Sequence, residues 1–129
     1  MGEANRIRIL VVDDASLVRL YYRTTLERAG FNVDEALNGV EALEKLLTTP
    51  VDLVIVDVNM PQMDGFSFVE ALRRQELPLA STPALIASTE RGPQDFDASR
   101  AAGANFYLVK PVSDELLVQY ASMLSGKAG

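Results

Sequence analysis

The sequence predicts an α/β fold in which five helices flank a five-stranded parallel sheet, and three observations support this fold class. Four short apolar runs are branched and nearly continuous, at 7–12, 51–56, 83–87 and 105–109. Such runs are typical of strands covered on both faces, as the strands of parallel sheets are. Stretches with helical spacing fill the gaps, and this alternation indicates an open sheet. The length of 129 residues predicts one domain, with its core at about 6–125.

The first half of the chain supplies one further strand and two helices. Apolar residues recur at helical spacing from Val18 to Ala29, and Gly30 follows as a stop signal. A weaker run at 31–36 alternates between apolar and polar residues, which predicts a strand at the sheet edge. A second helix is predicted from the spacing of three apolar residues and ends before Pro50; these residues are Val40, Leu43 and Leu47.

Capping signals mark the three later helices. Asp64 is a plausible N-cap for a helix that carries Phe68, and Pro93 fits the first turn of the next helix. Ser113 can cap a last helix, whose tail at 125–129 we expect to fray. Right-handed crossovers would place these helices on both faces of the sheet.

Composition excludes several classes of function. The chain has no cysteine and no histidine, which excludes disulfides and disfavours structural zinc. Its formal net charge of −6 argues against nucleic-acid binding, which requires clustered Lys and Arg. No apolar stretch approaches the length of a membrane span, so we expect a cytoplasmic protein with no membrane partner.

Polar residues follow the predicted strands at the edge where ligands bind in such sheets. Asp13 and Asp14 follow the first run, Asp57 the next long run, Ser88 the fourth strand and Lys110 the fifth. Each alone has an ordinary explanation, because an Asp or Ser after a strand is usually a cap and a Lys is usually solvated. Together they predict that three carboxylates, one hydroxyl and one ammonium converge.

Clustered carboxylates repel one another unless a cation joins them, and hard oxygen ligands select Mg²⁺ or Ca²⁺. Mg²⁺ suits this cluster better, because it takes one or two protein carboxylates together with a phosphate. A carboxylate beside such an ion can attack phosphorus. Asp57 is therefore a candidate nucleophile, with Lys110 and Ser88 placed to stabilise charge on the phosphoryl oxygens.

Taken in order, these motifs resemble the receiver domain of two-component response regulators. The matching segments are Val11-Val12-Asp13-Asp14, Asp57-Val58-Asn59-Met60-Pro61 with Asp64-Gly65, Ser88, and Lys110-Pro111. The resemblance covers about 6–125 and is nearest to stand-alone chemotaxis regulators, mainly through 59–65. It implies a flavodoxin-like fold with strand order 2-1-3-4-5.

The resemblance also implies roles for the residues of the site. Asp57 would be phosphorylated, and Mg²⁺ would bind Asp14, Asp57 and the backbone carbonyl of Asn59, with Asp13 helping through water. Lys110 would contact the phosphoryl group. Ser88 would swing toward it and vacate space for Tyr107, the aromatic rotamer switch. The peptide bond before Pro111 would be cis. Asn59 and Glu90 flank the site, and we expect them to position or exclude the water that hydrolyses the aspartyl phosphate.

The expected partners follow from the same resemblance. The donor would be a histidine kinase. Because the chain has no histidine of its own, the phosphoryl group must come from another protein or from a small phosphodonor. The target would bind a face formed by the helix that begins at Pro93, the strand at 105–109 and the last helix, near Phe96, Arg100, Tyr107 and Tyr120. The last helix lacks Lys and Arg, unlike many flagellar-switch binders. We expect a monomer or weak dimer that acts as a switch and not as an enzyme.

Three alternatives stay open at this point. A phosphorelay intermediate or phosphate sink would use the same chemistry without a direct effector. A haloacid-dehalogenase-like phosphatase also uses a strand-end Asp and Mg²⁺, but it needs a second Asp two residues on, where this chain has Asn59. A degenerate receiver would serve only for docking, although the filled acid, hydroxyl and lysine positions argue against that reading.

Overall fold

The structure is a computed structural model that describes residues 6–126. The strands are β1 (Arg8–Val12), β2 (Asn32–Ala36), β3 (Leu53–Asp57), β4 (Ala84–Ser88) and β5 (Phe106–Val109). The helices are α1 (Ser16–Arg28), α2 (Gly39–Thr48), α3 (Gly65–Arg73), α4 (Pro93–Ala102) and α5 (Asp114–Ser125), with a 3₁₀ turn, η2 (Leu79–Ser81), before β4. Among these described residues, no helix has both the length and the apolar character needed to cross a bilayer.

The five strands form one parallel sheet in the order β2-β1-β3-β4-β5, which confirms the expected order. The register is what positions the site. Val12 pairs with Val56 across β1 and β3, and Val56 pairs with Ile86 across β3 and β4. Ser88 pairs with Val109 across β4 and β5. The carboxyl ends of the central strands are therefore level with one another, and the residues that follow them meet at one edge.

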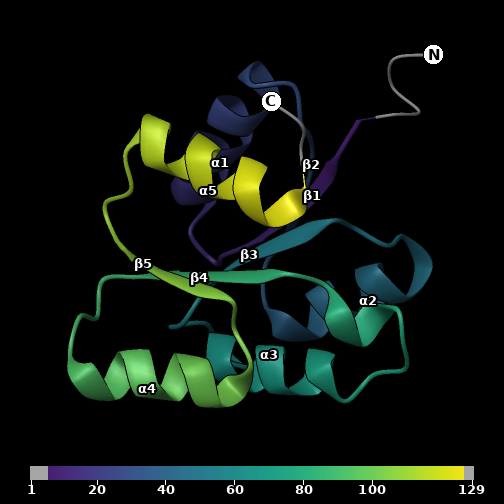
Figure 1. The fold of residues 1–129 in the computed structure, drawn as a ribbon, viewed down its shortest axis with the longest axis vertical. Coiled ribbons are helices and arrows are strands. Elements are labelled where there is room, and N and C mark those ends of the chain that lie inside the picture. Colours follow the sequence, from purple (N-terminus) through teal and green to yellow (C-terminus); the bar gives the residue numbers. More distant parts are fainter. Residues whose placement is uncertain (1–5, 127–129) are drawn as a thin grey trace.

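Helices cover both faces of the sheet, with α1 and α5 on one side and α2, α3 and α4 on the other (Figure 1). Alternate residues of each central strand face opposite layers. Val12 and Val56 pack with Phe68 on the α3 side, whereas Val11 packs with Leu26 on the α1 side. Both layers are apolar, which accounts for the nearly continuous apolar runs of the central strands.

The predicted caps are present at the helix ends. Asp64 accepts a hydrogen bond from the Ser67 N–H at 2.8 Å, and Ser113 accepts one from the Leu116 N–H at 3.2 Å. Pro93 is the first residue of α4. Helix α5 continues to Ser125, and residues 127–129 of the tail that we expected to fray lie outside the described part of the chain.

Helix α2 forms where predicted, but of the three apolar residues that predicted it only Leu43 packs against the core. Val40 and Leu47 are 42% and 68% exposed. The buried residues lie one position earlier, at Gly39, Ala42 and Leu46. The buried and exposed stripes have the same spacing. Because the buried stripe carries a glycine and an alanine, it is the less hydrophobic of the two, and hydropathy therefore predicts burial of the exposed stripe. The small residues let the helix approach its neighbours, since a Cβ at position 39 would lie 2.8 Å from the Met63 sulfur.

Adjacent leucines of α2 provide a matched test of this arrangement. Leu46 is 2% exposed and Leu47 is 68% exposed, so Leu46→Ala leaves a cavity and Leu47→Ala does not. We expect Leu46→Ala to lower the free energy of unfolding by about 2–4 kcal/mol. Leu47→Ala should change it by no more than about 0.5 kcal/mol. Urea unfolding measures both, and equal losses would show that the buried face is assigned wrongly.

Candidate functional site

The three acidic residues come together at the carboxyl ends of β1 and β3. Asp13 and Asp14 follow β1 directly, and Asp57 is the last residue of β3. One carboxylate oxygen from each lies within 4.8 Å of the others. Asp13 is buried, Asp57 is partly buried and Asp14 is exposed, so the cluster runs from the interior to the surface. This is the convergence that the strand-end positions predicted.

Lys110 supplies the positive charge of the site. Its Nζ lies 2.9 Å from Asp13 Oδ2 and 3.0 Å from Asp57 Oδ1. Because it follows the outer strand β5, its side chain extends across the end of β4 to reach both acids. Its backbone N–H is held by the Ser88 carbonyl oxygen at 2.7 Å. The peptide bond to Pro111 is cis.

The cluster contains three carboxylates but one ammonium, which leaves two negative charges in excess. Burial raises the pKa of Asp57, and the hydrogen bond and charge of Lys110 only partly oppose this. Asp13 and Asp14 add repulsion that raises it further. For Lys110, burial acts to lower the pKa, but hydrogen bonds to Asp13 and Asp57 outweigh it and the pKa is raised. Two carboxylates therefore stabilise the Lys110 charge, whereas at Asp57 burial and repulsion outweigh the single ammonium.

This donor set fits a divalent cation. The oxygens are hard ligands of the kind that Mg²⁺ and Ca²⁺ prefer, and an ion of charge two would balance the excess. Exposed Asp14 and partly buried Asp57 are the carboxylates best placed to hold it. Both oxygens of Asp13 are already engaged, since Oδ2 faces Lys110 and Oδ1 accepts the Ala15 N–H at 2.9 Å. The carbonyl of Asn59 lies in the loop that follows β3.

Gly65 keeps this loop close to the end of β3. Its N–H donates to the Val58 carbonyl oxygen at 2.9 Å. A Cβ at position 65 would lie 2.4 Å from the Asp57 carbonyl oxygen, so the backbone of α3 can approach only because this residue is glycine. The motif Asp64-Gly65 therefore both caps α3 and seats it against the site.

Ser88 and Tyr107 meet at the backbone of Glu90. Ser88 is the fully buried last residue of β4, and its Oγ accepts the Glu90 N–H at 3.1 Å. The Tyr107 hydroxyl donates to the Glu90 carbonyl oxygen at 2.7 Å. The Tyr107 ring packs edge-on against Phe96 of α4, with centroids 4.9 Å apart. Burial raises the pKa of Tyr107. These contacts connect the end of β4 to α4.

The sequence patterns did not single out several residues of α1 that support the site. Tyr22 is buried, and burial raises its pKa to about 12, opposed by the nearby Lys110 charge. The Tyr21 hydroxyl donates to Asp114 Oδ1 at 2.5 Å, and its oxygen lies 2.8 Å from Val112 O, which places α1 against the turn after Lys110. Both tyrosines lie within the apolar stripe from Val18 to Ala29, and their long-range contacts leave no local signal in the sequence.

Comparison with known proteins identifies relatives that align with nearly the whole chain. A protein-family model described as the response regulator receiver domain matches residues 9–122. The crystal structure of the chemotaxis response regulator CheY4 of Vibrio cholerae is 38% identical, with a TM-score of 0.86, and covers 93% of this chain and 99% of that one. A putative response regulator from Chloroflexus aurantiacus is 30% identical, with a TM-score of 0.88, over 95% of this chain and 100% of that one.

Curated relatives are much longer than the matched region. The sensor protein EvgS of Escherichia coli is 37% identical over 121 residues, which is 92% of this chain but 10% of that protein. The transcriptional regulatory protein PrrA of Mycobacterium leprae is 39% identical over 118 residues, or 91% of this chain and 49% of that protein. The chain thus spans half or less of these proteins, and matches one domain of each.

The raised pKa of Asp57 has a consequence for stability without metal. Its carboxyl binds a proton more tightly in the folded state, so ionisation destabilises the fold as pH rises above the ordinary carboxyl range near 4. Asp57→Asn removes this charge and should raise the free energy of unfolding at pH 7 in EDTA. The gain should shrink on acidification toward pH 4. Urea unfolding at both pH values measures it, and a mutant less stable than wild type at pH 7 would contradict the balance of charge described here.

Proposed function

The chain belongs to the response regulator receiver domain family, and from that premise we propose that Asp57 accepts a phosphoryl group from a histidine kinase in a magnesium-dependent reaction. Receiver domains act as signalling switches and not as classical enzymes. The observation that supports the acceptor role is the position of Asp57, whose carboxylate lies among two further acids and the Lys110 ammonium. The haloacid-dehalogenase alternative lacks its second aspartate at Asn59, and the family match argues against it as well.

The transfer itself needs one free carboxylate oxygen. Lys110 contacts Oδ1 of Asp57, and we assign the attack on phosphorus to Oδ2. A new O–P bond forms while the N–P bond to the donor imidazole breaks, and the electron pair leaves with the ring nitrogen. Lys110 then lies beside the new phosphoryl group, where its charge stabilises the equatorial oxygens.

Asp14, Asp57 and the Asn59 backbone carbonyl would hold Mg²⁺, with Asp13 contributing through water. Bound there, the ion would supply the positive charge that the cluster lacks and would offset charge on the transferred oxygens. Lys110 holds Asp13 and Asp57 near each other, so the acids are already gathered. Asn59 and Glu90 are exposed beside the site, where they can position or exclude the water that removes the phosphoryl group.

The proposed switch runs from Ser88 to the face formed by α4, β5 and α5. A phosphoryl group adds strong acceptor oxygens beside Asp57. If Ser88 turns toward it, Ser88 releases the Glu90 N–H, and Glu90 is also the partner of the Tyr107 hydroxyl. The Tyr107 ring packs on Phe96, so a change in this segment reaches α4. A few kcal/mol between two packings would be enough for switching.

This face is suited to a protein target. Two aromatic pairs lie along it, Phe96 with Tyr107 and Phe106 with Tyr120, the latter with centroids 4.7 Å apart. Phe96 and Phe106 are exposed. Similarity to a chemotaxis regulator favours a role in chemotaxis or related signalling. Because α5 carries no basic residue, we expect a target different from the acidic segments that basic α5 helices meet.

A relay intermediate or phosphate sink is the second candidate. The observation that favours it is the identity of 37% to a segment of a sensor protein, which shows that receivers of this sequence type also occur outside proteins named as regulators. The chemistry at Asp57 would be the same in both cases. An effector should gain or lose binding to a target protein when it is phosphorylated, whereas a relay or sink has no such target.

Phosphorylation by a small donor tests the proposal directly. With Mg²⁺ and acetyl phosphate, intact mass should rise by one phosphoryl group, because we assign the attack to Asp57. The addition should disappear with EDTA and in Asp57→Asn. Asp52→Asn is the matched control, since this acid lies on β3's opposite end and should label like wild type. A wild-type protein that stays unmodified, or a mutant that still labels, would contradict the proposal, and sustained phosphate release from a generic ester would favour a phosphatase.

A further inference from the structure

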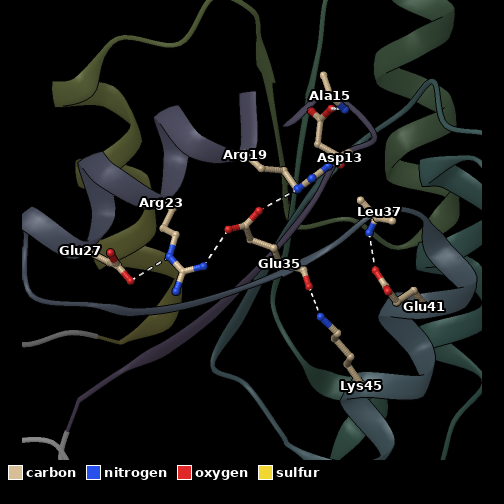
Figure 2. A network of polar contacts seen from close by, with 9 residues as sticks. All are labelled: Asp13, Ala15, Arg19, Arg23, Glu27, Glu35, Leu37, Glu41 and Lys45. Atoms are coloured by element: carbon tan, nitrogen blue, oxygen red, sulfur yellow. Dashed lines mark hydrogen bonds and ion pairs between the residues drawn. The ribbon is translucent and has the colours of Figure 1, made fainter. Parts of the chain in front are cut away.

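A network of charged residues connects α1 to β2 and reaches Asp13 (Figure 2). Glu35 of β2 is its centre. Its Oε1 accepts a bond from Arg19 Nε at 2.8 Å, and its Oε2 accepts one from Arg23 Nη1 at 2.7 Å. Bonds from Arg23 and Arg19 lower the pKa of Glu35, so the carboxylate stays ionised. We call Arg19, Arg23 and Glu35 the α1–β2 ion network.

Arg19 is the member of the network that reaches the site. Its Nη1 donates to the backbone carbonyl oxygen of Asp13 at 2.6 Å, while its Nε is held by Glu35. The side chain is 11% exposed, which reduces competition from water. The backbone carbonyl of Glu35 is held in turn by Lys45 of α2, so the anchor of Arg19 is itself fixed (Figure 2).

The bonded carbonyl orients the peptide unit that leads into Asp14. The carbonyl of Asp13 and the N–H of Asp14 belong to one planar peptide unit, so fixing the oxygen fixes the plane that leads into Asp14. The other polar groups of Asp13 are also bound, its N–H to Ala36 O at 3.1 Å and its carboxylate to Ala15 and Lys110. Asp13 is thus held in place by several hydrogen bonds, and Arg19 orients the peptide that joins it to Asp14.

We propose that Arg19 is a positioning residue for the metal site, which holds the Asp13–Asp14 peptide so that the Asp14 carboxylate faces Asp57. Glu35 serves this role indirectly, by fixing the guanidinium of Arg19. The inference rests on the proposed function, because it concerns the affinity of the site for Mg²⁺. It adds a dependence of metal binding on a residue that contributes no ligand atom.

The sign of the effect separates positioning from simple electrostatics. Arg19 is a cation near a cation site, so removing its charge should strengthen Mg²⁺ binding if Coulomb repulsion alone mattered. Loss of positioning should weaken binding instead. Partners that orient metal ligands typically change affinity on the order of 10–100-fold when mutated, which exceeds the effect of one screened charge.

Titration of the full chain with Mg²⁺ by calorimetry tests the proposal. Arg19→Gln should weaken binding on the order of 10-fold or more. Arg19→Lys keeps the charge but cannot span Asp13 and Glu35 with one planar group, so it should also weaken binding. Arg23→Gln is the matched control: it loses the same charge from the same helix and the same partner Glu35, but Arg23 does not contact Asp13. It should bind Mg²⁺ within about twofold of wild type.

Two further measurements make the outcome decisive. In the metal-free protein, the backbone amide resonance of Asp14 should move in Arg19→Gln and stay in Arg23→Gln. Urea unfolding in EDTA shows whether each variant is folded. If Arg19→Gln is unfolded, the Mg²⁺ affinity of Arg19→Lys tests the proposal in its place. Binding by Arg19→Gln as tight as that of Arg23→Gln overturns the role of Arg19. Failure of wild type to bind Mg²⁺ would instead overturn the proposed function.

Discussion

The bond between the Lys110 ammonium and the carboxylates of Asp13 and Asp57 is the interaction on which the site depends. It brings together groups that follow three different strands, β1, β3 and β5. The cluster still carries an excess of negative charge, since a single ammonium faces three acids. The proposed function uses both features, because the acids are gathered in advance and a divalent cation would balance their charge during phosphoryl transfer to a carboxylate.

The parallel sheet makes this bond possible. Pairing in register at Val12–Val56 and Val56–Ile86 brings the ends of three strands level, so acids that directly follow β1 and end β3 are neighbours without any special loop. Gly65 then lets α3 approach Asp57, and Arg19 holds the peptide of Asp13 from the other side. The site is therefore built from backbone positions first, and side chains complete it.

Much of this could be predicted from the sequence because it depends on local patterns. Continuous apolar runs identified the central strands, and the polar residues that follow them, such as Asp57 and Lys110, identified the site. Strand order came from the resemblance to receivers and was confirmed. The buried face of α2 was not predictable from hydropathy, because small Gly39 and Ala42 form it. The contacts of Arg19 with Glu35 and of Tyr22 with the Lys110 region were missed because they join residues that are well separated in the sequence.

In the proposed function, few residues connect the metal and phosphoryl site to the output face. Asp57 is at the centre, Ser88 and Glu90 are beside it, and Tyr107 packs against Phe96. A crystal structure with Mg²⁺ and beryllofluoride, an analogue of the phosphoryl group, tests its centre most directly. The account predicts the analogue on Asp57, the ion on Asp14, Asp57 and the Asn59 carbonyl, and Lys110 in contact with fluoride. An ion bound away from these acids, or an analogue that leaves Asp57 free, would contradict it.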